Sequence, residues 1–420
     1  MKRYDIVVFG ATGFTGKYVF EEVYRQSKKE KFSFAIAGRN ADKLRLSLEE
    51  SASYLEDEGV KNTPIITADI NDEKSIIEMA KQAVIVLNCV GPYRFYGETV
   101  VKACVENGSH HLDISGEPQY LETMQLKYHK EAENRGVYVI GACGFDSIPP
   151  EMGIKFLTDQ FKGAINDVEY FILNNSSKDH KIHFGTWESA IYGFAHRNEL
   201  GPLRKQLFSE RLPKGKYLPQ RRSLLFYSDD VKRWCLPFPG SDKTVVTRSQ
   251  HYLHFQKGTK PVQFTPYVTF PSILTTIFAI LIGAIFGLFS SFGCGRTLLL
   301  KFPRLFSFGL VSVEGASRKA IENSKMELVM IGKGWSSSSL VDVEKPNRKI
   351  ICSISGPEPG YWSCSIFIVQ AAITILKESV KMPGNGGVFA PLAAFNDTSY
   401  LERLQNNEIN FARVSDIMLH

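Results

Sequence analysis

The stretch Asp5-Ile6-Val7-Val8-Phe9-Gly10-Ala11-Thr12-Gly13-Phe14-Thr15-Gly16 decides the fold of this 420-residue chain. Its first five residues are typical of a buried strand, and a helical pattern follows from Thr15 to Arg25. A turn with three glycines lets the backbone approach phosphates without a Cβ in the way, and it aims the first N–H groups of the helix at an anion. We therefore predict that a dinucleotide pyrophosphate is bound by Gly10, Ala11, Thr12, Gly13, Phe14, Thr15 and Gly16.

The alternation of short apolar strands and helices continues through about the first 145 residues. Further strands are expected at residues 32–38, 65–68, 84–90, 111–114 and 137–140. Several of these runs carry Val and Ile at consecutive positions, as expected for a parallel sheet with helices on both faces. The pattern predicts an α/β domain of the Rossmann type, with a doubly wound parallel sheet.

The alternation of strands and helices ends after Pro149 and Pro150. Residues 151–270 mix short aromatic and β-branched runs with Gly, Pro and basic clusters, which is typical of an antiparallel sheet with long loops. A helix is expected over residues 367–379. At about 150 residues per domain, the chain length also favours two or three domains.

The composition narrows the class of protein. The net charge of +6 is too small for a general nucleic-acid binder, although residues 201–260 hold 13 Lys and Arg against four Asp and Glu. Seven cysteines without CxxC spacing argue against a disulfide framework and a zinc site, and His110 and His111 are interpreted as strand residues. We expect a reducing compartment, no metal, no nucleic-acid partner, and no signal peptide ahead of the strand that begins by Tyr4.

Arg39 decides the predicted cofactor. In sheets of this type an acidic residue after the second strand selects NAD, whereas an arginine accommodates the 2′-phosphate of NADP. Here the strand ends Ala37-Gly38-Arg39-Asn40 without a carboxylate. We predict NADP(H) over NAD(H), against the alternative that Arg39 is a solvated surface charge. Asp69, after the third strand, either accepts a hydrogen bond from the adenine amino group or caps the next helix.

The run Asn88-Cys89-Val90-Gly91-Pro92-Tyr93 ends the fourth strand, at the edge where a dinucleotide places its nicotinamide half. We predict that this half is contacted by Cys89, Val90, Gly91, Pro92 and Tyr93, with Gly91 allowing the backbone close to the ribose. Tyr93 and Tyr96 are expected either to stack or donate near the nicotinamide ring, or to pack the loop.

Several blocks together resemble the saccharopine dehydrogenase-like oxidoreductases. They are VVFGATGFTG (7–16), AGRNADKL (37–44), VLNCVGPYRFYGE (86–98), DISGEPQ (113–119), GFDSIP (144–149) and GGVFAPLAAF (386–395). The resemblance implies a Rossmann domain, a second α+β domain built on a mixed sheet, and a C-terminal segment that packs back on the first. We set these parts at residues 1–148, 149–384 and 385–420. Family relatives described as trans-acting enoyl reductases in bacterial glycolipid synthesis suggest a lipid substrate.

Tyr96, Asp113 and Asp146 are the candidates for catalysis. Hydride transfer needs a group that supplies or removes a proton, and each of these residues lies near a strand end. Each also has a structural interpretation, since Asp113 can cap the following turn and Asp146 can begin an Asx or type I turn. The catalytic residue is therefore left unassigned.

The apolar segment from Ser272 to Phe292 is a second strong signal. Residues 261–295 carry no charge and no histidine, and 21 residues of helix reach about 31 Å, roughly the thickness of a bilayer core. A buried core helix is the alternative, although such helices are usually amphipathic. A single crossing would separate parts that the resemblance assigns to one folded unit. We expect a membrane-associating segment that enters one leaflet and returns, with bends or close packing permitted by Gly283, Gly287, Gly293 and Gly295.

These observations lead to a hypothesis on function. We expect an NADP(H)-dependent oxidoreductase that acts on a lipid-like carbonyl or enoyl compound at a membrane or lipid-droplet surface, in lipid or glycolipid metabolism. It would lie on the cytosolic face of the endoplasmic reticulum or on lipid droplets, with the mitochondrion as the alternative, and residues 201–260 would face anionic headgroups. A soluble saccharopine-type amino-acid reductase and a non-catalytic dinucleotide-binding protein of lipid droplets stay open, as does a homodimer.

Overall fold

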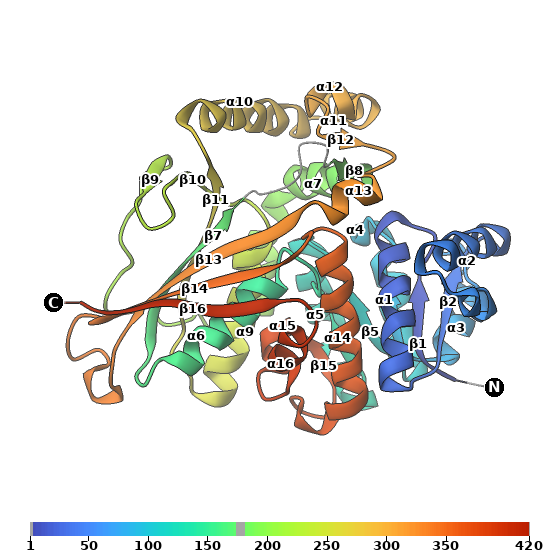
Figure 1. Cartoon of the computed structure of the whole chain (residues 1–420). Helices are drawn as coiled ribbons and strands as arrows, with labels where there is room; N and C mark the ends of the chain where they lie inside the picture. The colour runs from blue at the N-terminus through green and yellow to red at the C-terminus, as the bar shows by residue number, and fades with distance from the viewer. Residues whose placement is uncertain (1–2, 174–180, 420) are drawn as a thin grey trace. The chain divides into compact units, whose positions relative to one another are not determined.

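Two compact units make up the chain in the computed structural model, which describes residues 3–173 and 181–419. Unit 1 comprises Met1–Phe145, Arg197–Leu207 and Gly360–Arg403, and unit 2 comprises Asp146–His196, Phe208–Pro359 and Leu404–His420. Within the described residues, each unit is built on its own seven-stranded sheet. Figure 1 shows the course of the chain.

Unit 1 has a parallel sheet in the order β15-β6-β5-β4-β1-β2-β3. Its strands are β1 (Tyr4–Phe9), β2 (Phe34–Gly38), β3 (Ile65–Thr67), β4 (Ala83–Asn88), β5 (His110–Asp113), β6 (Tyr138–Ile140) and β15 (Gly387–Phe389). Its helices are α1 (Phe14–Glu30), α2 (Ala41–Leu55), α3 (Glu73–Lys81), α4 (Tyr93–Asn107), α5 (Pro118–Arg135), α8 (Leu200–Leu207), α14 (Trp362–Glu378) and α15 (Pro391–Phe395), with α16 (Tyr400–Gln405) beginning in this unit. The predicted doubly wound α/β domain is confirmed.

The strands of this sheet are buried on both faces. Ile6, Val7 and Val8 of β1 have no exposed surface, and Phe9 is 2% exposed. Successive side chains of a strand point to opposite faces, so a run that is buried at every position requires helices on both faces. The apolar run in β1 therefore specifies a covered parallel sheet.

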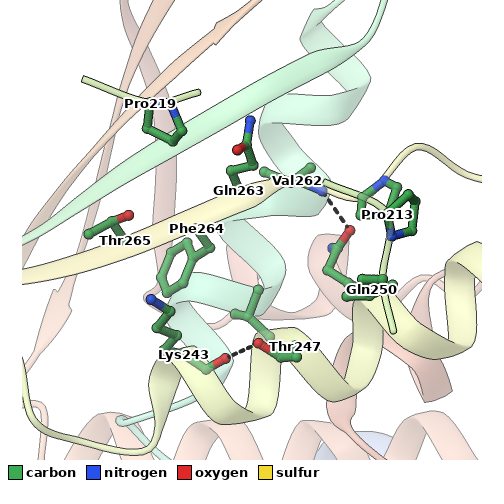
Figure 2. A pocket seen from close by; sticks show the side chains of 12 residues that line it. Pro213, Pro219, Lys243, Thr247, Gln250, Val262, Gln263, Phe264 and Thr265 are labelled. Carbon is green, nitrogen blue, oxygen red and sulfur yellow. Dashed lines mark hydrogen bonds between the residues drawn. The ribbon is translucent and has the colours of Figure 1, made fainter. Parts of the chain in front are cut away.

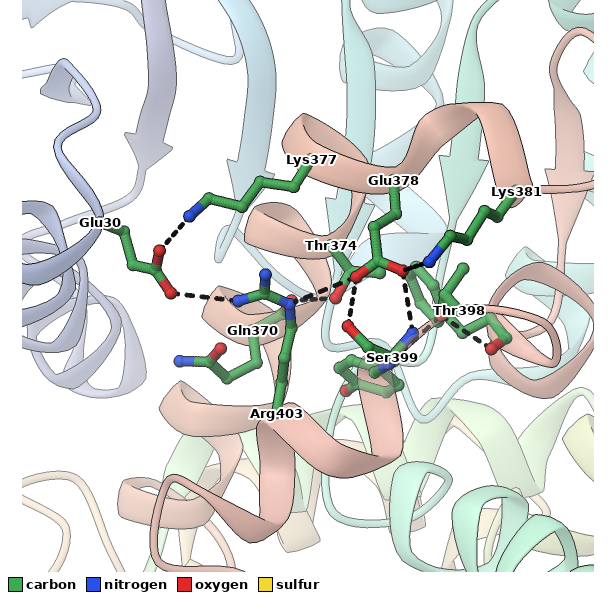
Figure 3. A network of polar contacts seen from close by, with 11 residues as sticks. Glu30, Gln370, Thr374, Lys377, Glu378, Lys381, Thr398, Ser399 and Arg403 are labelled. Carbon is green, nitrogen blue, oxygen red and sulfur yellow. Dashed lines mark hydrogen bonds and ion pairs between the residues drawn. The ribbon is translucent and has the colours of Figure 1, made fainter.

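The C-terminal part of unit 1 is held to α1 by an ion-pair network (Figure 3). Glu30, at the end of α1, pairs with Lys377 and with Arg403, the latter at 3.1 Å. Glu378 accepts from the Ser399 N–H at 3.0 Å and from the Ser399 hydroxyl, and it pairs with Lys381 at 2.9 Å. Burial opposes ionisation of Glu378, but the hydrogen bonds from Ser399 and Lys381 hold its pKa at about 2.

The domain bounds in the structure differ from the expected ones in several segments. The passage to unit 2 comes at Asp146 rather than after residue 148. The segment Arg197–Leu207 and helix α14 belong to unit 1, where α14 packs on α1 and on strands β4 and β5. Of the expected C-terminal segment, β15 joins the parallel sheet, whereas Leu404–His420 belongs to unit 2. These assignments depend on packing between segments far apart in the sequence, which local patterns do not specify.

Unit 2 has a mixed sheet in the order β16-β14-β13-β7-β11-β10-β9. Its strands are β7 (Ile165–Leu173), β9 (Phe226–Ser228), β10 (Arg233–Pro237), β11 (Gln263–Phe270), β13 (Lys325–Gly334), β14 (Arg348–Pro357) and β16 (Asn410–Met418), with a separate short pair of β8 (Ile182–His183) and β12 (Val311–Ser312). The residue pattern over 151–270 predicted an antiparallel sheet, which is wrong for one pair, because β7 and β11 run parallel. A long crossover that includes α9 joins these two strands and permits the parallel pairing. The mixed sheet that the family resemblance implies is confirmed.

Helices α6 (Ile148–Gln160) and α9 (Asp242–Lys257) pack against each other and against this sheet. Successive side chains of β7 point to opposite faces of the sheet. Tyr170 lies beside Phe264 of β11, with ring centroids 5.8 Å apart, while Phe171 belongs to a core cluster with Tyr267 and Phe226. The remaining helices of unit 2 are α7 (Phe184–Ala195), α10 (Ile273–Ser290), α11 (Gly293–Lys301), α12 (Pro303–Phe306) and α13 (Arg318–Glu322).

Helix α10 corresponds to the apolar segment, and it is not a core helix. Only Thr276 and Ser290 of this helix are buried. Ser272 caps its start in a capping box with Thr275. The helix continues without interruption through Gly283 and Gly287, and the chain turns between α10 and α11. Close packing, the other expected role of the glycines, is found at Gly287, where a Cβ would lie 3.1 Å from the Phe194 ring, and at Gly295, where it would lie 2.3 Å from the Phe289 carbonyl oxygen.

By length and composition, two helices in the described parts of the chain are apolar enough to cross a membrane: α10 and a helix over Trp362–Lys381. The second corresponds to α14 and its extension, and 78% of it is buried, against 11% of α10. The helix expected over residues 367–379 is therefore a core helix, whereas α10 is exposed.

Substituting Glu378 tests the role of the network at the end of α14. We expect Glu378→Gln to lower the free energy of unfolding by about 1–3 kcal/mol at pH 7, because the Ser399 and Lys381 donors lose an ionised acceptor. The folded-state pKa lies below the ordinary value of 4.5, so the contribution is complete above that value and is lost as the pH falls toward 2. The difference in melting temperature between wild type and variant should therefore shrink from pH 7 to pH 3. Glu131→Gln, which breaks an exposed pair with Arg135, is the control, and an equal effect at both positions would contradict the assignment.

Candidate cofactor site

The glycine-rich loop after β1 allows an unusually close approach of two backbone segments. Gly10 has a φ of +87°, and its N–H donates to the carbonyl oxygen of Ala37 at 2.9 Å. A Cβ on Gly16 would lie 2.1 Å from the Gly10 carbonyl oxygen, which no other residue type tolerates without a shift of the backbone. The first turn of α1 is thus packed directly against the end of β1.

The N-terminus of α1 is open to an anion. The helix begins at Phe14 with Gly13 as its N-cap, and no side chain caps it. The first N–H groups of a helix lack partners within the helix, and with the helix dipole they attract negative charge. Thr12 and Gly13 are exposed at this end, while Ala11 is fully buried. The backbone therefore fits a pyrophosphate here, and the contacts of the individual loop residues stay predictions.

Tyr361 packs against this loop, a contact that sequence reasoning missed. Its ring lies 4.5 Å from that of Phe14 in an edge-to-face arrangement and 6.2 Å from that of Tyr18. Tyr361 is only 4% exposed, so it fixes the first turn of α1 from the side. No motif marks this tyrosine, and it lies far from Phe14 along the chain.

Arg39 follows the last residue of β2 and is exposed. Asn40 caps α2 by accepting from the Lys43 N–H at 2.9 Å, so the cap does not use the arginine. Within residues 3–173 and 181–419, Arg39 has no hydrogen bond or ion pair. Its guanidinium is available for a 2′-phosphate, which it can meet with a planar fork of donors.

Asp69 does not cap the helix that follows it. The cap of α3 is Asp72, whose side chain accepts from the Lys74 N–H. Asp69 instead accepts from the N–H and the side-chain amide of Asn71, at 3.0 and 3.1 Å. The capping alternative is therefore wrong, because the Asx turn places Asp69 three residues before the cap. Its contact with adenine stays a prediction.

The turn after β4 is fixed by Asn88 and Glu117, both buried. Asn88 accepts from the Val90 N–H at 3.0 Å through its side chain and from the Tyr93 hydroxyl at 2.9 Å through its carbonyl. The Glu117 carboxylate accepts from the N–H groups of Tyr93 and Arg94, at 2.9 and 3.1 Å, and so closes the N-terminus of α4. These bonds hold the predicted nicotinamide-side residues Cys89, Val90, Gly91 and Pro92 in one conformation, and their contacts with the cofactor stay predictions.

The structure favours packing as the role of Tyr93. Its ring stacks on Tyr120 with centroids 5.6 Å apart, and its hydroxyl is engaged by Asn88. Tyr96 is 36% exposed on the first turn of α4 beside the exposed Phe95, where it remains accessible to a ligand. Burial raises the pKa of the Cys89 thiol far above its usual range, so this cysteine is not an activated nucleophile.

Asp113 ties two strand ends together. Its Oδ1 accepts from the N–H groups of Ser115 and Ala142, at 3.0 and 3.1 Å, and its Oδ2 accepts from the Tyr120 hydroxyl at 2.9 Å. The neighbouring His111 is neutral, because burial lowers its pKa to about 3. Both carboxylate oxygens of Asp113 accept hydrogen bonds from the protein itself, which supports a structural role for Asp113 rather than a catalytic one.

Asp146 lies in unit 2, just before α6. Burial raises its pKa to about 6. The three candidates for catalysis therefore do not form one cluster within a unit, since Tyr96 and Asp113 belong to unit 1.

A pocket of about 330 Å³ lies in unit 2 between α9, the start of β11 and residues 212–219 (Figure 2). Its polar groups are partly engaged: the Thr247 hydroxyl donates to the carbonyl oxygen of Lys243 at 2.7 Å, and the Gln250 side chain accepts from the Val262 N–H at 3.0 Å. Lys243 is the one charged residue among those that line it. None of the predicted site residues lines this pocket, and we assign it no role.

The fold and the site define the class of the protein. A parallel sheet in this order, a glycine-rich turn that opens α1 and an arginine after β2 are the features of a Rossmann-type domain for NADP. Residues 6–140 match the family model described as saccharopine dehydrogenase NADP binding domain. The predicted cofactor is thereby confirmed at the level of the family.

Full-length comparisons show the family. The saccharopine dehydrogenase-like oxidoreductase of Homo sapiens is 44% identical over 420 residues, which cover 99% of this chain and 98% of the human protein. The chain therefore belongs to the saccharopine dehydrogenase-like oxidoreductases. The lipid droplet localized protein of Caenorhabditis elegans is 37% identical over 427 residues, which cover 99% of each chain. Apo saccharopine dehydrogenase (L-Glu forming) from Saccharomyces cerevisiae has a TM-score of 0.54 at 11% identity, over 98% of this chain and 100% of its own, which shows a shared fold alone.

Reversing the charge at Arg39 tests the basis of cofactor selection. We expect Arg39→Glu to weaken NADPH binding at least tenfold, because a carboxylate replaces the cation that meets the 2′-phosphate. NADH binding should change much less. Fluorescence titration with both nucleotides measures the ratio. Arg135→Glu, the same charge change on the exposed end of α5, should leave it unaltered, and equal weakening of both nucleotides by Arg39→Glu would refute the assignment.

Substituting Asp146 tests its burial through the pH dependence of stability. The pKa of Asp146 is raised from 3.8 to about 6 in the folded protein, so its carboxyl is tolerated in the fold below pH 4 and destabilises it as the pH rises through 6. We expect Asp146→Asn to raise the melting temperature at pH 8 and to leave it almost unchanged at pH 4. Asp159→Asn, on the exposed end of α6 in a pair with Lys155, should not show this gain. A loss of stability for Asp146→Asn at pH 8 would rule the interpretation out.

Proposed function

We propose that this protein is an NADP(H)-dependent oxidoreductase that acts on a lipid-like carbonyl or enoyl group while held on the surface of a lipid droplet or membrane. The family and the cofactor domain support the chemistry. The observation that carries the location is the exposed apolar layer formed by α10, α11 and α12, residues 273–306. When bound, NADPH supplies the hydride, and the chain's own residues bind and orient the reactants.

The apolar layer presents large hydrophobic side chains to solvent. Leu274, Leu281 and Leu288 are 75, 57 and 63% exposed, and their spacing of seven residues places them on one face of α10. Other exposed large side chains in or next to the layer are Ile277, Phe278, Ile285, Phe292, Leu298, Phe302, Leu305, Phe308 and Leu310. Large exposed apolar side chains that gather on consecutive helices mark a membrane or partner site more often than isolated ones do, so the layer supports a lipid partner.

The inner face of α10 is attached to unit 2. The ring of Phe286 lies 5.0 Å from that of Trp187 and 6.1 Å from that of Phe194, both on α7. The Trp187 indole N–H also donates to the carbonyl oxygen of Leu299 on α11, at 3.0 Å. Figure 1 shows α10, α11 and α12 following one another beyond the end of β11. The layer is therefore anchored to α7 and has one face free for lipid.

Strand pairing argues against a helix that spans the bilayer. β11, just before α10, pairs with β7, and β13, after the layer, pairs with the same strand from its other side. A spanning α10 would place these two strands on opposite sides of the membrane. A second crossing would be needed to bring the chain back, but the nine residues of α11 reach only about 14 Å. An α10 that lies along the surface, with its outer face in the lipid, satisfies both pairings.

Electrostatic attraction contributes less to this attachment than the sequence suggested. Three cations of the basic segment 201–260 have partners within the protein. Arg204 pairs with Glu122, Arg222 with Glu169, and Lys260 with Asp342. In the layer itself, Arg304 pairs with Glu314 at 2.9 Å. These cations are not available to anionic headgroups, whereas the exposed apolar side chains of the layer contribute about 25 cal/mol for each Å² removed from water.

A triple variant on the outer face of α10 tests the proposed location. We expect Leu274→Ser, Leu281→Ser and Leu288→Ser together to lower binding to phosphatidylcholine-coated triolein droplets at least tenfold, because three exposed leucines no longer enter the lipid. Flotation measures the bound fraction. NADPH affinity, measured by titration, should stay unchanged.

The matched control is the triple variant Leu46→Ser, Leu218→Ser and Leu224→Ser, whose leucines are also more than half exposed but lie outside the layer. It should bind droplets like the wild type. Equal losses in both variants, or none in the first, would overturn the proposed location, and import of the full chain into mitochondria would favour the alternative compartment. NADPH oxidation with lipids that co-purify tests the chemistry, and tight NADPH binding without any turnover would favour the non-catalytic alternative.

A further inference from the structure

Unit 2 contains a buried group of polar side chains that has no role in the function proposed above. Ser147 precedes α6, Tyr170 lies on β7, and Asp242 is the first residue of α9. We call these three residues the donor cluster. They are between 0 and 1% exposed, although each carries a strongly polar group.

The fold brings these residues together from three elements. Helix α6 packs on both α9 and β7. The first turns of the two helices are linked, since the Ser241 hydroxyl donates to the carbonyl oxygen of Asp146 at 3.5 Å. Further along, the Ser249 hydroxyl of α9 donates to the buried Glu151 carboxylate of α6. Tyr170 lies on β7, the strand that α6 covers, and the carboxyl groups of Asp242 and Asp146 are the charged groups that act on its side chain.

The polar atoms of the donor cluster have no hydrogen-bond partner within the described residues. This holds for the Ser147 hydroxyl, for the Tyr170 hydroxyl and for both carboxylate oxygens of Asp242. A buried polar atom without a partner destabilises the folded state, and native proteins rarely keep one without a water or a ligand. Four such atoms on three neighbouring elements therefore point to a group that enters and satisfies them.

The surroundings of Asp242 favour its protonated, uncharged form. Its carboxyl group is 1% exposed and has no hydrogen-bond partner within the described residues, which disfavours a charge there. Burial, reinforced by Asp146 and Glu151, raises its pKa well above its usual range, and the dipole of α9 opposes this only weakly. The next residue, Lys243, is exposed and lines the pocket of Figure 2, and the buried Arg248 of α9 has interactions of its own. The cluster therefore offers hydrogen-bond donors without a positive charge.

We propose that the donor cluster binds the carbonyl oxygen of an uncharged ketone, ester or thioester group of the substrate. A phenol and a carboxylic acid kept neutral by burial are an effective donor pair for such an oxygen, because both donate without reorganisation. Asp146 and Glu151 beside the cluster disfavour a carboxylate in the same place. Asp146 is half-buried, which leaves the cluster one side near the protein surface. The inference rests on the proposed function and narrows its substrate class to neutral carbonyl compounds.

Infrared spectroscopy of a labelled probe tests this binding directly. The probe is hexadecan-2-one with ¹³C at its carbonyl carbon, added to the full chain in detergent. We expect the carbonyl stretching band to fall in frequency on binding, relative to the probe in detergent alone, because two donors polarise the C=O bond. Tyr170→Phe and Asp242→Leu each remove one donor, so each should return the band part of the way and weaken binding about tenfold, while a purely structural role would leave the frequency of bound probe unchanged.

The control variant is Asp159→Asn, which alters an exposed carboxylate of α6 and should keep the wild-type band. Tyr170→Phe keeps the ring and Asp242→Leu keeps a side chain of similar shape, and melting curves establish that each variant folds. A band that does not move in the wild type, or one that moves equally in all variants, overturns the donor cluster as the carbonyl site. Turnover of another lipid with NADPH under those conditions would leave the proposed function standing, so the two failures are distinguishable.

Discussion

The pairing of β7 with β11 on one side and β13 on the other constrains the whole of unit 2. These two neighbours are separated along the chain by the most apolar helix of the protein, and both must lie in one sheet. Their backbone hydrogen bonds fix where the chain leaves the sheet and where it returns. Because a single membrane crossing would separate the two partners of the same strand, the sheet supports the proposal that α10 lies along a surface. Whether a helix crosses a membrane is usually inferred from its hydropathy. For α10 the argument comes from the pairing of the neighbouring strands.

Unit 1 depends on a different kind of contact, between segments far apart along the chain. The glycine-rich loop is shaped locally by the approach of Gly16 to Gly10, but it is supported by Tyr361 from the segment before α14. The end of α1 is held in turn by Lys377 and Arg403. The cofactor domain is therefore completed by its C-terminal part, and a chain truncated after β6 would lack both the strand that pairs with β6 and the helix that covers α1.

The sequence was sufficient wherever the determining contacts are local. The Val-rich run of β1, the glycine spacing and Arg39 specify the parallel sheet and the cofactor edge from neighbouring residues. Two features depended on packing that a local pattern does not contain. The parallel pairing of β7 and β11 requires a crossover, and the membership of α14 in unit 1 requires a surface that buries it. The choice of Asp72 over Asp69 as the cap of α3 is local, but the residue pattern left it open because both aspartates precede the helix. The buried polar atoms of Ser147, Tyr170 and Asp242, which lack hydrogen-bond partners within the described residues, could likewise not be found from a local pattern.

Charge distinguishes two kinds of substrate for a protein of this fold. An amino acid with several carboxylates requires cations placed to meet them, and such cations must be held free of internal partners. In unit 2 the partly buried Arg222 is committed to the buried Glu169 through two hydrogen bonds, and none of the three residues of the donor cluster carries a positive charge. A neutral carbonyl compound with a long apolar part fits both proposals for unit 2, the apolar layer as a lipid-binding surface and the donor cluster as a partner for an uncharged oxygen. The name that the family takes from saccharopine is thus a weaker guide to the substrate than the charges of the residues themselves.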